Sequence, residues 1–513
     1  MPYRAAVTDY LFMIDTLLDA DALRQTTRFE EATADVTAAI LEEAGKLCDE
    51  VLAPLQRNGD LHPARLENGV VRTSPGFAEG FKAIAEGGWI GMGALVSGEW
   101  AGTMNLTEPQ AGSDVGALKA KAVDNGDGTY AISGQKIYIS WGDHDVAENI
   151  CHLVLARLPG APEGTKGISL FLVPKFIPNA DGTVGARNGV STVSLEHKLG
   201  LHGSPTAVMQ YDNATGWLVG PEQGGMAAMF TMMNNARLGV GGQGVGVAEA
   251  AYQHALSYAL DRKQGRAGAD GTGSIADHAD VRRMLVEMKA DVFAARAIGL
   301  SCAYALDMAN ATGDASWRAR AALLTPIAKA FGTDTGCNVA HTGVQVHGGM
   351  GVIEETAAAQ FGRDVRVTTI YEGTNGIQAM DLVARKMMDG GEAAGLLLDE
   401  MEEDIERARP DFPNMADACW QACESMREAT EWLVAQDDMN NRFAGAVPFL
   451  RAFARVLGAQ LHLKAAMADK GGPREKLARF YILRMLPEHA GLLTHAQAGE
   501  ADLFAVTTDA LAS

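Results

Sequence analysis

The leading candidate for proton chemistry in this chain is a glutamate, Glu372, which stands between an apolar stretch and a glycine. Glu372 lies in RVTTIYEGTNGIQ (366–378), after a β-branched run and between Tyr371 and Gly373. A carboxylate in an apolar site has a raised pKa and suits general-base work near neutral pH. The same pattern also fits an exposed glutamate near a helix cap, because most glutamates lie on protein surfaces.

Two glycine-containing segments could bind a phosphate or a ring. The first is MNLTEPQAGSD (104–114), whose Gly-Ser-Asp turn presents consecutive backbone N–H groups and a hydroxyl. The second is GVQVHGGMGV (343–352), where glycines allow a ligand to approach the backbone closely. A plain connection between elements and a helix C-cap remain the alternatives for the two segments.

Other candidate chemistry is weak. His278 and His347 stand alone, so we expect a packed or nucleotide-contacting role for each and no metal site. The Met-rich stretch 226–238 predicts core packing or a pliable pocket wall. The chain has no GxSxG, Walker or GxGxxG motif. Its six cysteines include no CxxC pair, and Cys419 and Cys423 have the spacing of one buried helix face.

Composition excludes several classes of protein. The 513 residues carry a net charge of −21, so neither nucleic acid nor an anionic membrane is expected as a partner. Asp9, Asp15 and Asp19 interrupt the apolar pattern of the N-terminus, which argues against a signal peptide. The chain contains no run of about 18 apolar residues, so we expect no membrane span. We therefore expect a cytoplasmic protein with reduced cysteines.

The elements that must position these residues fall into four parts. Residues 1–98 read as helical, with a helix at 32–55 that Pro54 and the polar RNGDLHP segment end. Residues 99–220 read as six or so antiparallel strands in a small barrel or sandwich. Residues 221–390 return to long helices that pack as a bundle, and residues 391–513 form a further helical region after a linker at DGGEAAG.

The expected strands and helices have these ranges. Strands are predicted at 119–124, 129–133, 136–140, 149–158, 167–174 and 206–212, with turns at NGDG and SGQ. Long helices are predicted at 244–263, 279–309 and 325–349.

The motifs, in this order, resemble the acyl-CoA dehydrogenase family. The resemblance rests on TEPQAGSD (107–114), GQKIYIS (134–140), YALDRK (258–263) with DHADVRRML (277–285), QVHGGMGV (345–352) and IYEGTNGIQ (370–378). It covers roughly residues 30–390. The extended N-terminus, the added C-terminal helices and EHKLGLHGSPT (196–206) are similar to the branch that contains 3-methylmercaptopropionyl-CoA dehydrogenase.

The resemblance implies a mainly α fold with a central β domain. It consists of an N-terminal helical domain (1–98), an antiparallel β barrel or sandwich that binds flavin (99–220), and a C-terminal four-helix bundle with the catalytic Glu (221–390). An additional helical domain follows (391–513). The implied reaction is FAD-dependent α,β-dehydrogenation of a short-chain acyl-CoA, and of 3-(methylthio)propanoyl-CoA in the dimethylsulfoniopropionate branch. Electrons would pass to electron-transferring flavoprotein, and the protein would be a homodimer or a dimer of dimers.

The resemblance also assigns residues to roles. It makes Glu372 the base, with Ser113, Arg237 and Gly373 near the substrate. Some relatives place the base just before the arginine of the first long helix, where this chain has Ala236. The residues implied in FAD binding are Leu106, Thr107, Gly112, Ser113, Tyr138, Ser140, Arg262, Gln345, Gly348, Gly349 and Thr374. Of these, Arg262 and the 345–349 loop would reach the FAD of a neighbouring subunit.

The chain departs from the family pattern at several places. Ala279 and Gly376 stand where glutamine is common, which weakens the implied adenine contacts. Ala94 joins GWIGMG (88–93) directly to LVSGEWAGTM (95–104), where relatives carry about 60 more residues of the half-domain over the substrate. Other functions considered are a general short- or medium-chain acyl-CoA dehydrogenase of β-oxidation, an acyl-CoA oxidase, a DNA-associated flavoprotein of the same fold, and a non-catalytic scaffold.

Overall fold

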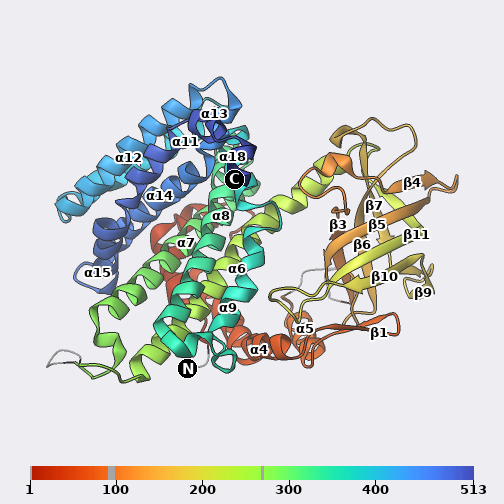
Figure 1. Cartoon of the computed structure of the whole chain (residues 1–513), viewed down its shortest axis with the longest axis horizontal. Coiled ribbons are helices and arrows are strands. Elements are labelled where there is room, and N and C mark those ends of the chain that lie inside the picture. Colours follow the sequence, from red (N-terminus) through yellow and green to blue (C-terminus); the bar gives the residue numbers. More distant parts are fainter. Residues whose placement is uncertain (1–2, 90–98, 267–270) are drawn as a thin grey trace. The chain divides into compact units, whose positions relative to one another are not determined.

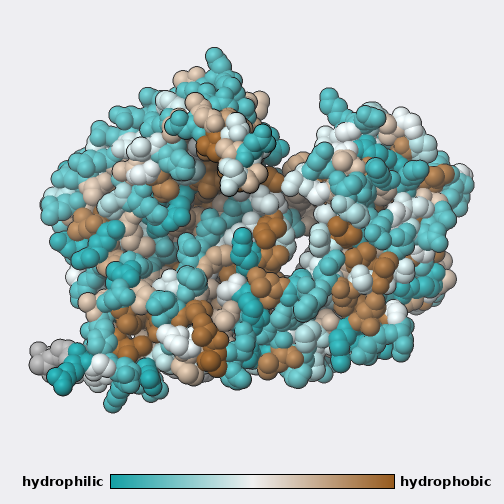
Figure 2. Space-filling view, viewed as in Figure 1, coloured by the Kyte–Doolittle hydropathy of each residue, from teal (hydrophilic) through white to brown (hydrophobic). Residues whose placement is uncertain are grey.

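The computed structural model describes residues 3–89, 99–266 and 271–513, which divide into two compact units. One unit contains residues 1–45 and 235–513, and the other contains residues 46–234. The expected shortening between 93 and 96 lies outside the described residues. The face of the molecule in Figure 2 is mostly hydrophilic, which agrees with the net charge of −21.

The smaller unit is built on a β barrel (Figure 1). The pairings β11–β5–β4–β6–β7–β11 close into a ring, and β10 and β3 extend it. Its strands are β3 (Trp100–Asn105), β4 (Lys121–Asp124), β5 (Tyr130–Ser140), β6 (Asn149–Arg157), β7 (Ile168–Pro174), β10 (Val190–Leu195) and β11 (Thr206–Val219). Alternating side chains such as Ile132, Val154 and Phe171 fill the barrel, because successive residues of a strand face opposite sides.

Short elements complete this unit. They are η2 (Leu47–Leu52), α4 (Ala53–Leu61), β1 (Arg65–Glu67), β2 (Val70–Arg72), α5 (Phe77–Glu86), η3 (Val115–Ala117), η4 (Thr165–Gly167), β8 (Phe176–Pro178) and β9 (Val184–Arg187).

Three details of the sequence prediction for this unit are wrong. Pro54 does not end a helix, because the chain stays helical from the π-helical turn η2 through Ala53 into α4, which ends at Leu61. SGQ (133–135) is not a turn but part of β5, whose pairing with β11 shifts register next to Gly134. The sheet is not wholly antiparallel, because β3 pairs with β6 in parallel.

The larger unit is a helical bundle. Its long helices are α6 (Gly225–Asp261), which begins in the smaller unit, α7 (Ala279–Thr312) and α8 (Ala315–His347). Gly241 and Gly244 of α6 lie against the backbone of α8 at Ala328 and Gly332, so a side chain at either glycine would collide with that backbone. The two helices therefore pack closely in parallel.

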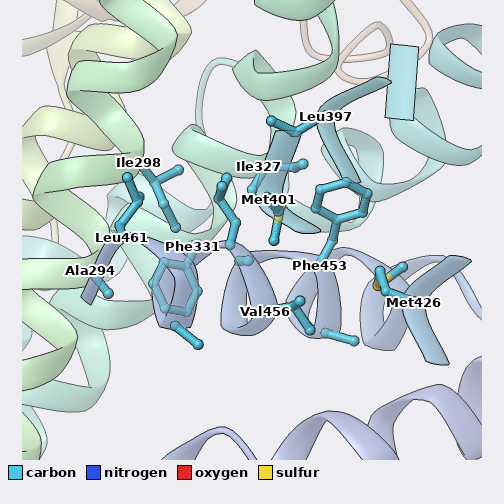
Figure 3. Packing of buried hydrophobic residues seen from close by; sticks show 14 of the residues in the cluster. Ala294, Ile298, Ile327, Phe331, Leu397, Met401, Met426, Phe453, Val456 and Leu461 are labelled. Carbon is cyan, nitrogen blue, oxygen red and sulfur yellow. The ribbon is translucent and has the colours of Figure 1, made fainter. Parts of the chain in front are cut away.

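The C-terminal helices share one core with this bundle (Figure 3). Ile298 of α7 and Phe331 of α8 pack in the same cluster as Met401 and Phe453 from the C-terminal helices. Met13 and Leu17 of the N-terminal segment belong to it as well. The contacts therefore divide the chain differently from the four predicted domains: residues 1–45 and 391–513 both join the bundle.

The remaining elements of this unit surround the long helices. They are α1 (Val7–Phe12), η1 (Met13–Leu17), α2 (Ala20–Arg24), α3 (Ala34–Lys46), η5 (Ile275–Asp277), η6 (Gly348–Val352), η7 (Glu354–Thr356), α9 (Ala358–Val365), η8 (Arg366–Thr369), α10 (Asn375–Val383), η9 (Arg385–Met387), α11 (Glu392–Ala408), α12 (Pro413–Val434), α13 (Met439–Ala444), α14 (Ala446–Ala468), α15 (Pro473–Phe480), η10 (Tyr481–Met485), α16 (Glu488–Ala496), α17 (Ala501–Ala505) and α18 (Thr508–Ala512).

Helix α7 is apolar on most of its surface. Among the described residues it is the one helix long and apolar enough to cross a membrane by length and composition. However, 61% of its apolar window is buried inside the protein. That burial is what the central helix of a bundle requires, since such a helix is covered on several sides.

Candidate active site

Glu372 lies in a tight turn between η8 and α10 of the larger unit. The φ angles of Glu372 and Gly373 are 56° and 88°, so two successive residues adopt the left-handed conformation. That conformation is unfavourable for a residue with a side chain and persists only where its surroundings hold it. Thr374 then caps α10 by accepting a hydrogen bond from the Ile377 N–H at 3.2 Å.

Three helices hold the backbone of this turn. The carbonyl of Glu372 accepts hydrogen bonds from Arg237 Nε of α6 at 3.3 Å and from Gln378 Nε2 of α10 at 3.2 Å. The carbonyl of Gly373 accepts one from Lys329 Nζ of α8 at 2.9 Å. These bonds offset the strain, so the position of Glu372 is fixed by the bundle and not by its own loop.

Burial and the neighbouring charges shift the pKa of Glu372 in opposite directions. Burial raises the pKa of the Glu372 carboxyl, while the positive charges of Arg237 and Lys329 act to lower it. Arg237 is buried and lies 3.6 Å from Asp381, so it is itself paired. A carboxylate with a raised pKa, on a backbone held from three sides, can accept a proton near neutral pH.

A pocket of about 530 Å³ adjoins the turn on the same unit. Thr374, Asn375 and Gly376 line one side of it. Arg366 and Arg451 bring two guanidinium groups to the same pocket. The start of α10 and the two cations favour a phosphate group, whereas the carboxyl of Asp334, which also lines the pocket, acts against one.

Four predicted cofactor residues lie at the far end of the bundle. Arg262 directly follows α6, and Gln345, Gly348 and Gly349 lie at the end of α8. The two ends are side by side, because the ring of Tyr258 stacks on that of His347 at 4.4 Å. Twenty-five residues of α6 separate Arg237 from Arg262, or about 37 Å at the rise of a helix. The structure therefore does not bring this group to Glu372 within one chain.

The other six predicted cofactor residues gather on the smaller unit. Leu106, Thr107, Gly112 and Ser113 belong to the loop that follows β3, and Tyr138 and Ser140 end β5. The two segments are joined where the Ile137 N–H donates to the Thr107 carbonyl at 2.9 Å. The Tyr138 side chain is 62% exposed although it lies in the barrel wall.

A buried ion pair supports this loop. Glu108 and Lys136 are 4% and 0% exposed, and their side chains lie 2.8 Å apart. Glu108 also accepts hydrogen bonds from the N–H groups of Lys119 at 2.6 Å and Ala120 at 3.0 Å. Lys136 Nζ donates to the Leu106 carbonyl at 3.0 Å. The buried Glu108–Lys136 pair thus anchors the loop to the barrel.

The free groups of this loop fit a flavin. Among the described residues, none accepts a hydrogen bond from the amides of Gly112, Ser113 or Asp114. Unsatisfied amides of a turn are donors for a phosphate or a ring carbonyl. The exposed Tyr138 offers a flat apolar surface beside them. The donor set therefore suits FAD, as the resemblance implies.

Several functional residues were missed from sequence. Lys329 is a lysine within the apolar run TPIAKAFG, and that mismatch was a usable signal. Gln378, Glu108 and Lys136 carry no such signal, because their partners are distant in sequence. In the part of the chain that the structure describes, no group of three His, Cys, Asp or Glu is placed to hold a metal ion.

Family models match most of the chain. Residues 103–214 match the acyl-CoA dehydrogenase middle domain, and residues 223–388 match the acyl-CoA dehydrogenase C-terminal domain. Residues 397–507 match a domain described as acetyl-CoA dehydrogenase C-terminal like.

Named relatives extend over nearly the whole chain. 3-Methylmercaptopropionyl-CoA dehydrogenase of Ruegeria pomeroyi is 41% identical over 93% of this chain and 94% of its own length. That alignment runs over 552 positions, more than the 513 residues of this chain, so the relative carries residues without a counterpart here. Butyryl-CoA dehydrogenase of Syntrophomonas wolfei is 37% identical over 77% of this chain and 71% of its own length.

Solved structures share the fold. ACDH-11 of Caenorhabditis elegans, in complex with C11-CoA, has a TM-score of 0.76 at 20% identity and covers 92% of this chain and 91% of its own. An acyl-CoA dehydrogenase of Bacillus anthracis complexed with FAD has a TM-score of 0.64 at 20% identity, over 93% of this chain and 80% of its own. The matched domains and the 41% identical relative place the chain in the acyl-CoA dehydrogenase family of FAD-dependent oxidoreductases that act on CH–CH groups.

Proposed function

We propose that this acyl-CoA dehydrogenase oxidises a short-chain acyl-CoA thioester, 3-(methylthio)propanoyl-CoA, to its 2-enoyl product with Glu372 as the base. The observation that carries the proposal is the Glu372 turn. Burial raises the pKa of its carboxyl, and Arg237, Lys329 and Gln378 hold the turn in place.

The chain's residues have distinct roles in this reaction. Glu372 takes the α-proton of the thioester, and its backbone N–H holds the thioester oxygen, which makes that proton more acidic. Arg237 donates to the Glu372 carbonyl and so helps to hold the turn that carries this N–H. FAD, when bound, supplies the acceptor for the β-hydrogen, which leaves as hydride. Loss of the proton and the hydride leaves the C2–C3 double bond.

Within one chain, the cofactor would be held by two groups of residues. Leu106, Thr107, Gly112, Ser113, Tyr138 and Ser140 of the β unit would hold the ring and adjacent phosphates. Thr374 would contact the diphosphate, with the guanidiniums of its pocket as support. No His or Cys is assigned to a covalent flavin bond, so acid precipitation should release the yellow colour.

The assembly proposal rests on the two ends of α6. Arg262, Gln345, Gly348 and Gly349 lie about 37 Å along the helix from Arg237, so they would serve the FAD of a second copy. We therefore propose a homodimer or a dimer of dimers in the cytoplasm, which passes electrons to electron-transferring flavoprotein. Light scattering at assay concentration checks the assembly, and a fully active monomer would contradict it.

The proposed acyl group is based on the names of the relatives. The 41% identical relative is named for 3-methylmercaptopropionyl-CoA, and another is named for butyryl-CoA. The first acyl group is a butyryl chain with one sulfur inserted before its terminal methyl, so a panel of acyl-CoA substrates with an artificial electron acceptor decides between them. A preference for 3-(methylthio)propanoyl-CoA would place the enzyme in dimethylsulfoniopropionate catabolism. A preference for unsubstituted chains would place it in fatty-acid β-oxidation.

Glu372→Gln tests the base. The amide keeps the size of the side chain but takes no proton at neutral pH, and Ala236 offers no substitute at the other family position. Loss of a general base costs about 10²–10⁴-fold in rate. Stopped-flow bleaching of the flavin by acyl-CoA, read beside the FAD content of the variant, measures it. Bleaching at the wild-type rate would show that the base is elsewhere.

A further inference from the structure

Lys329 is a fully buried lysine that the proposed reaction does not use as an acid or a base. It lies on α8 with 0% of its surface exposed. Burial of a lysine costs folding free energy unless its ammonium group is hydrogen-bonded or paired.

The ammonium group of Lys329 is aimed at the Glu372 turn. Its Nζ donates to the Gly373 carbonyl at 2.9 Å and to Asn375 Oδ1 at 2.9 Å. Gly373 and Asn375 both lie within three residues of Glu372. The amide of Asn375 is itself held, since its Nδ2 donates to Asp334 Oδ1 at 2.7 Å.

The charges that face this turn come from three helices. Helix α6 contributes Arg237, which pairs with Asp381 of α10, and Asp381 in turn binds Arg385 at 2.5 Å. Helix α8 contributes Lys329 and Asp334. Burial raises the pKa of Asp334, against the charges of Arg451, Lys329 and Arg366, and its oxygen binds the Asn375 amide.

Arg237 forms an ion pair with Asp381, whereas Lys329 is bound by neutral groups. Both hydrogen bonds of its Nζ go to neutral oxygens. Among the residues that the structure describes, no carboxylate forms a direct ion pair with it. Burial lowers its pKa to about 8, so the amine is still charged at neutral pH. Its field therefore acts on Glu372 without a direct counter-charge.

We propose that Lys329 is a positioning residue that keeps Glu372 ionised through its charge and holds the left-handed turn through the Gly373 carbonyl. The proposal rests on the proposed role of Glu372 as the base. An opposite charge within about 4–6 Å of a carboxylate lowers its pKa by about 1–3 pH units. Because Arg237 remains, we expect the loss of Lys329 to have an effect at the lower end of that range.

Three substitutions separate the charge from the hydrogen bond. Lys329→Met removes both, Lys329→Gln keeps a hydrogen-bond donor without the charge, and Lys329→Arg keeps the charge. Flavin reduction by acyl-CoA is followed in the FAD-loaded enzyme by stopped flow between about pH 5 and pH 9. The Met and Gln variants should move the acid limb of the rate profile upward by about one pH unit. Below the limb both should be about 10-fold slower than wild type. The Gln variant should recover at high pH, whereas the Met variant should stay slower there because the Gly373 carbonyl has lost its donor. The Arg variant should keep the wild-type midpoint.

Lys464→Met is the matched control. Lys464 is a partly buried lysine on α14 whose Nζ donates to the Leu17 carbonyl at 2.8 Å and lies 3.8 Å from Asp404, and burial also lowers its pKa. Its loss should change the melting temperature but not the pH midpoint. A Gln variant with the wild-type midpoint, or a Met variant slowed equally at every pH, would overturn the proposal, because only a structural role would then remain.

Glu372→Gln separates this proposal from the proposed function. If that variant reduces flavin at the wild-type rate, Glu372 is not the base and the proposed mechanism fails. If it is inactive and the Lys329 variants keep the wild-type midpoint, only the role of Lys329 fails.

Discussion

The Glu108–Lys136 ion pair that supports the flavin loop allows a quantitative prediction, because Glu108 makes more additional hydrogen bonds than Lys136 does. Without Lys136, Glu108 still accepts hydrogen bonds from the Lys119 and Ala120 amides and from Gln110 Nε2 at 2.6 Å. Without Glu108, Lys136 keeps only the Leu106 carbonyl, and the two amides lose their acceptor. Removing one partner of a buried ion pair costs about 3–5 kcal/mol. We therefore expect about 3 kcal/mol for Lys136→Met and about 5 kcal/mol for Glu108→Leu.

The double variant tests the cause of these losses. With both charges gone, no uncompensated charge is buried, although the Lys119 and Ala120 amides still lack their acceptor. Glu108→Leu with Lys136→Met should thus cost less than the sum of the two single changes, by about 1–3 kcal/mol. FAD content should fall most in Glu108→Leu, because the loop that contains Thr107 and Ser113 loses its anchor.

Hydrogen exchange measured by mass spectrometry is the suitable assay. The chain has two compact units, so a single unfolding transition would not isolate the barrel. Peptides that cover β3 and β5 report the free energy of local opening directly. Additive losses, or a loss below about 1 kcal/mol in both single variants, would refute the view that the pair is a buried, mutually dependent anchor.

The remaining predictions concern backbone strain and pH. Gly373→Ala should destabilise the turn by about 1–2 kcal/mol and slow flavin reduction, because φ is 88° and an added Cβ would lie 2.7 Å from Gln378 Nε2. Gly362→Ala in α9, whose Cβ would meet no atom within 4 Å, is the control, and equal rates for both variants would contradict the reasoning. Burial lowers the pKa of His152 in the barrel and of His462 in the bundle to about 3. Each should therefore stabilise the fold fully above about pH 6.5 and lose that contribution as the pH falls toward 3, by about 1.4 kcal/mol per pH unit. Hydrogen exchange of peptides that cover α14, measured at pH 7 and pH 5, tests this for His462, and a His462→Gln variant as sensitive to pH as wild type would contradict it.

Local signals in the sequence predicted much of the fold. The strands at 149–158 and 167–174 match β6 and β7 within a residue at each end, because continuous β-branched runs bounded by turns leave little choice. The helix at 279–309 matches α7 at its start and ends three residues before it. The helix at 325–349 covers only the later part of α8, which begins at Ala315 and contains Pro326 in its interior. Cys419 and Cys423 share the buried face of α12, as their spacing predicted.

Local signals failed where a distant partner decides the outcome. SGQ reads as a turn, yet pairing with β11 keeps it in β5. The parallel pairing of β3 with β6 joins residues about fifty positions apart and has no local signature. The C-terminal helices read as a separate region, yet Met401 and Phe453 pack into the core of the bundle. Hydrophobic periodicity shows that a face is buried but not what covers it.

The candidate site divides in the same way. The sequence by itself determined which residues could do the chemistry, because Glu372, the TEPQAGSD loop and the GG turn after α8 are recognisable from residue type and local order. Only the tertiary structure decided the environment of Glu372: Arg237, Lys329 and Gln378 come from three helices and meet at two successive carbonyl groups. It also decided that Glu108 and Lys136 support the flavin loop as one buried pair. The physical reason is that residue identity is local, whereas burial, charge pairing and backbone strain arise from segments that meet only when the chain folds.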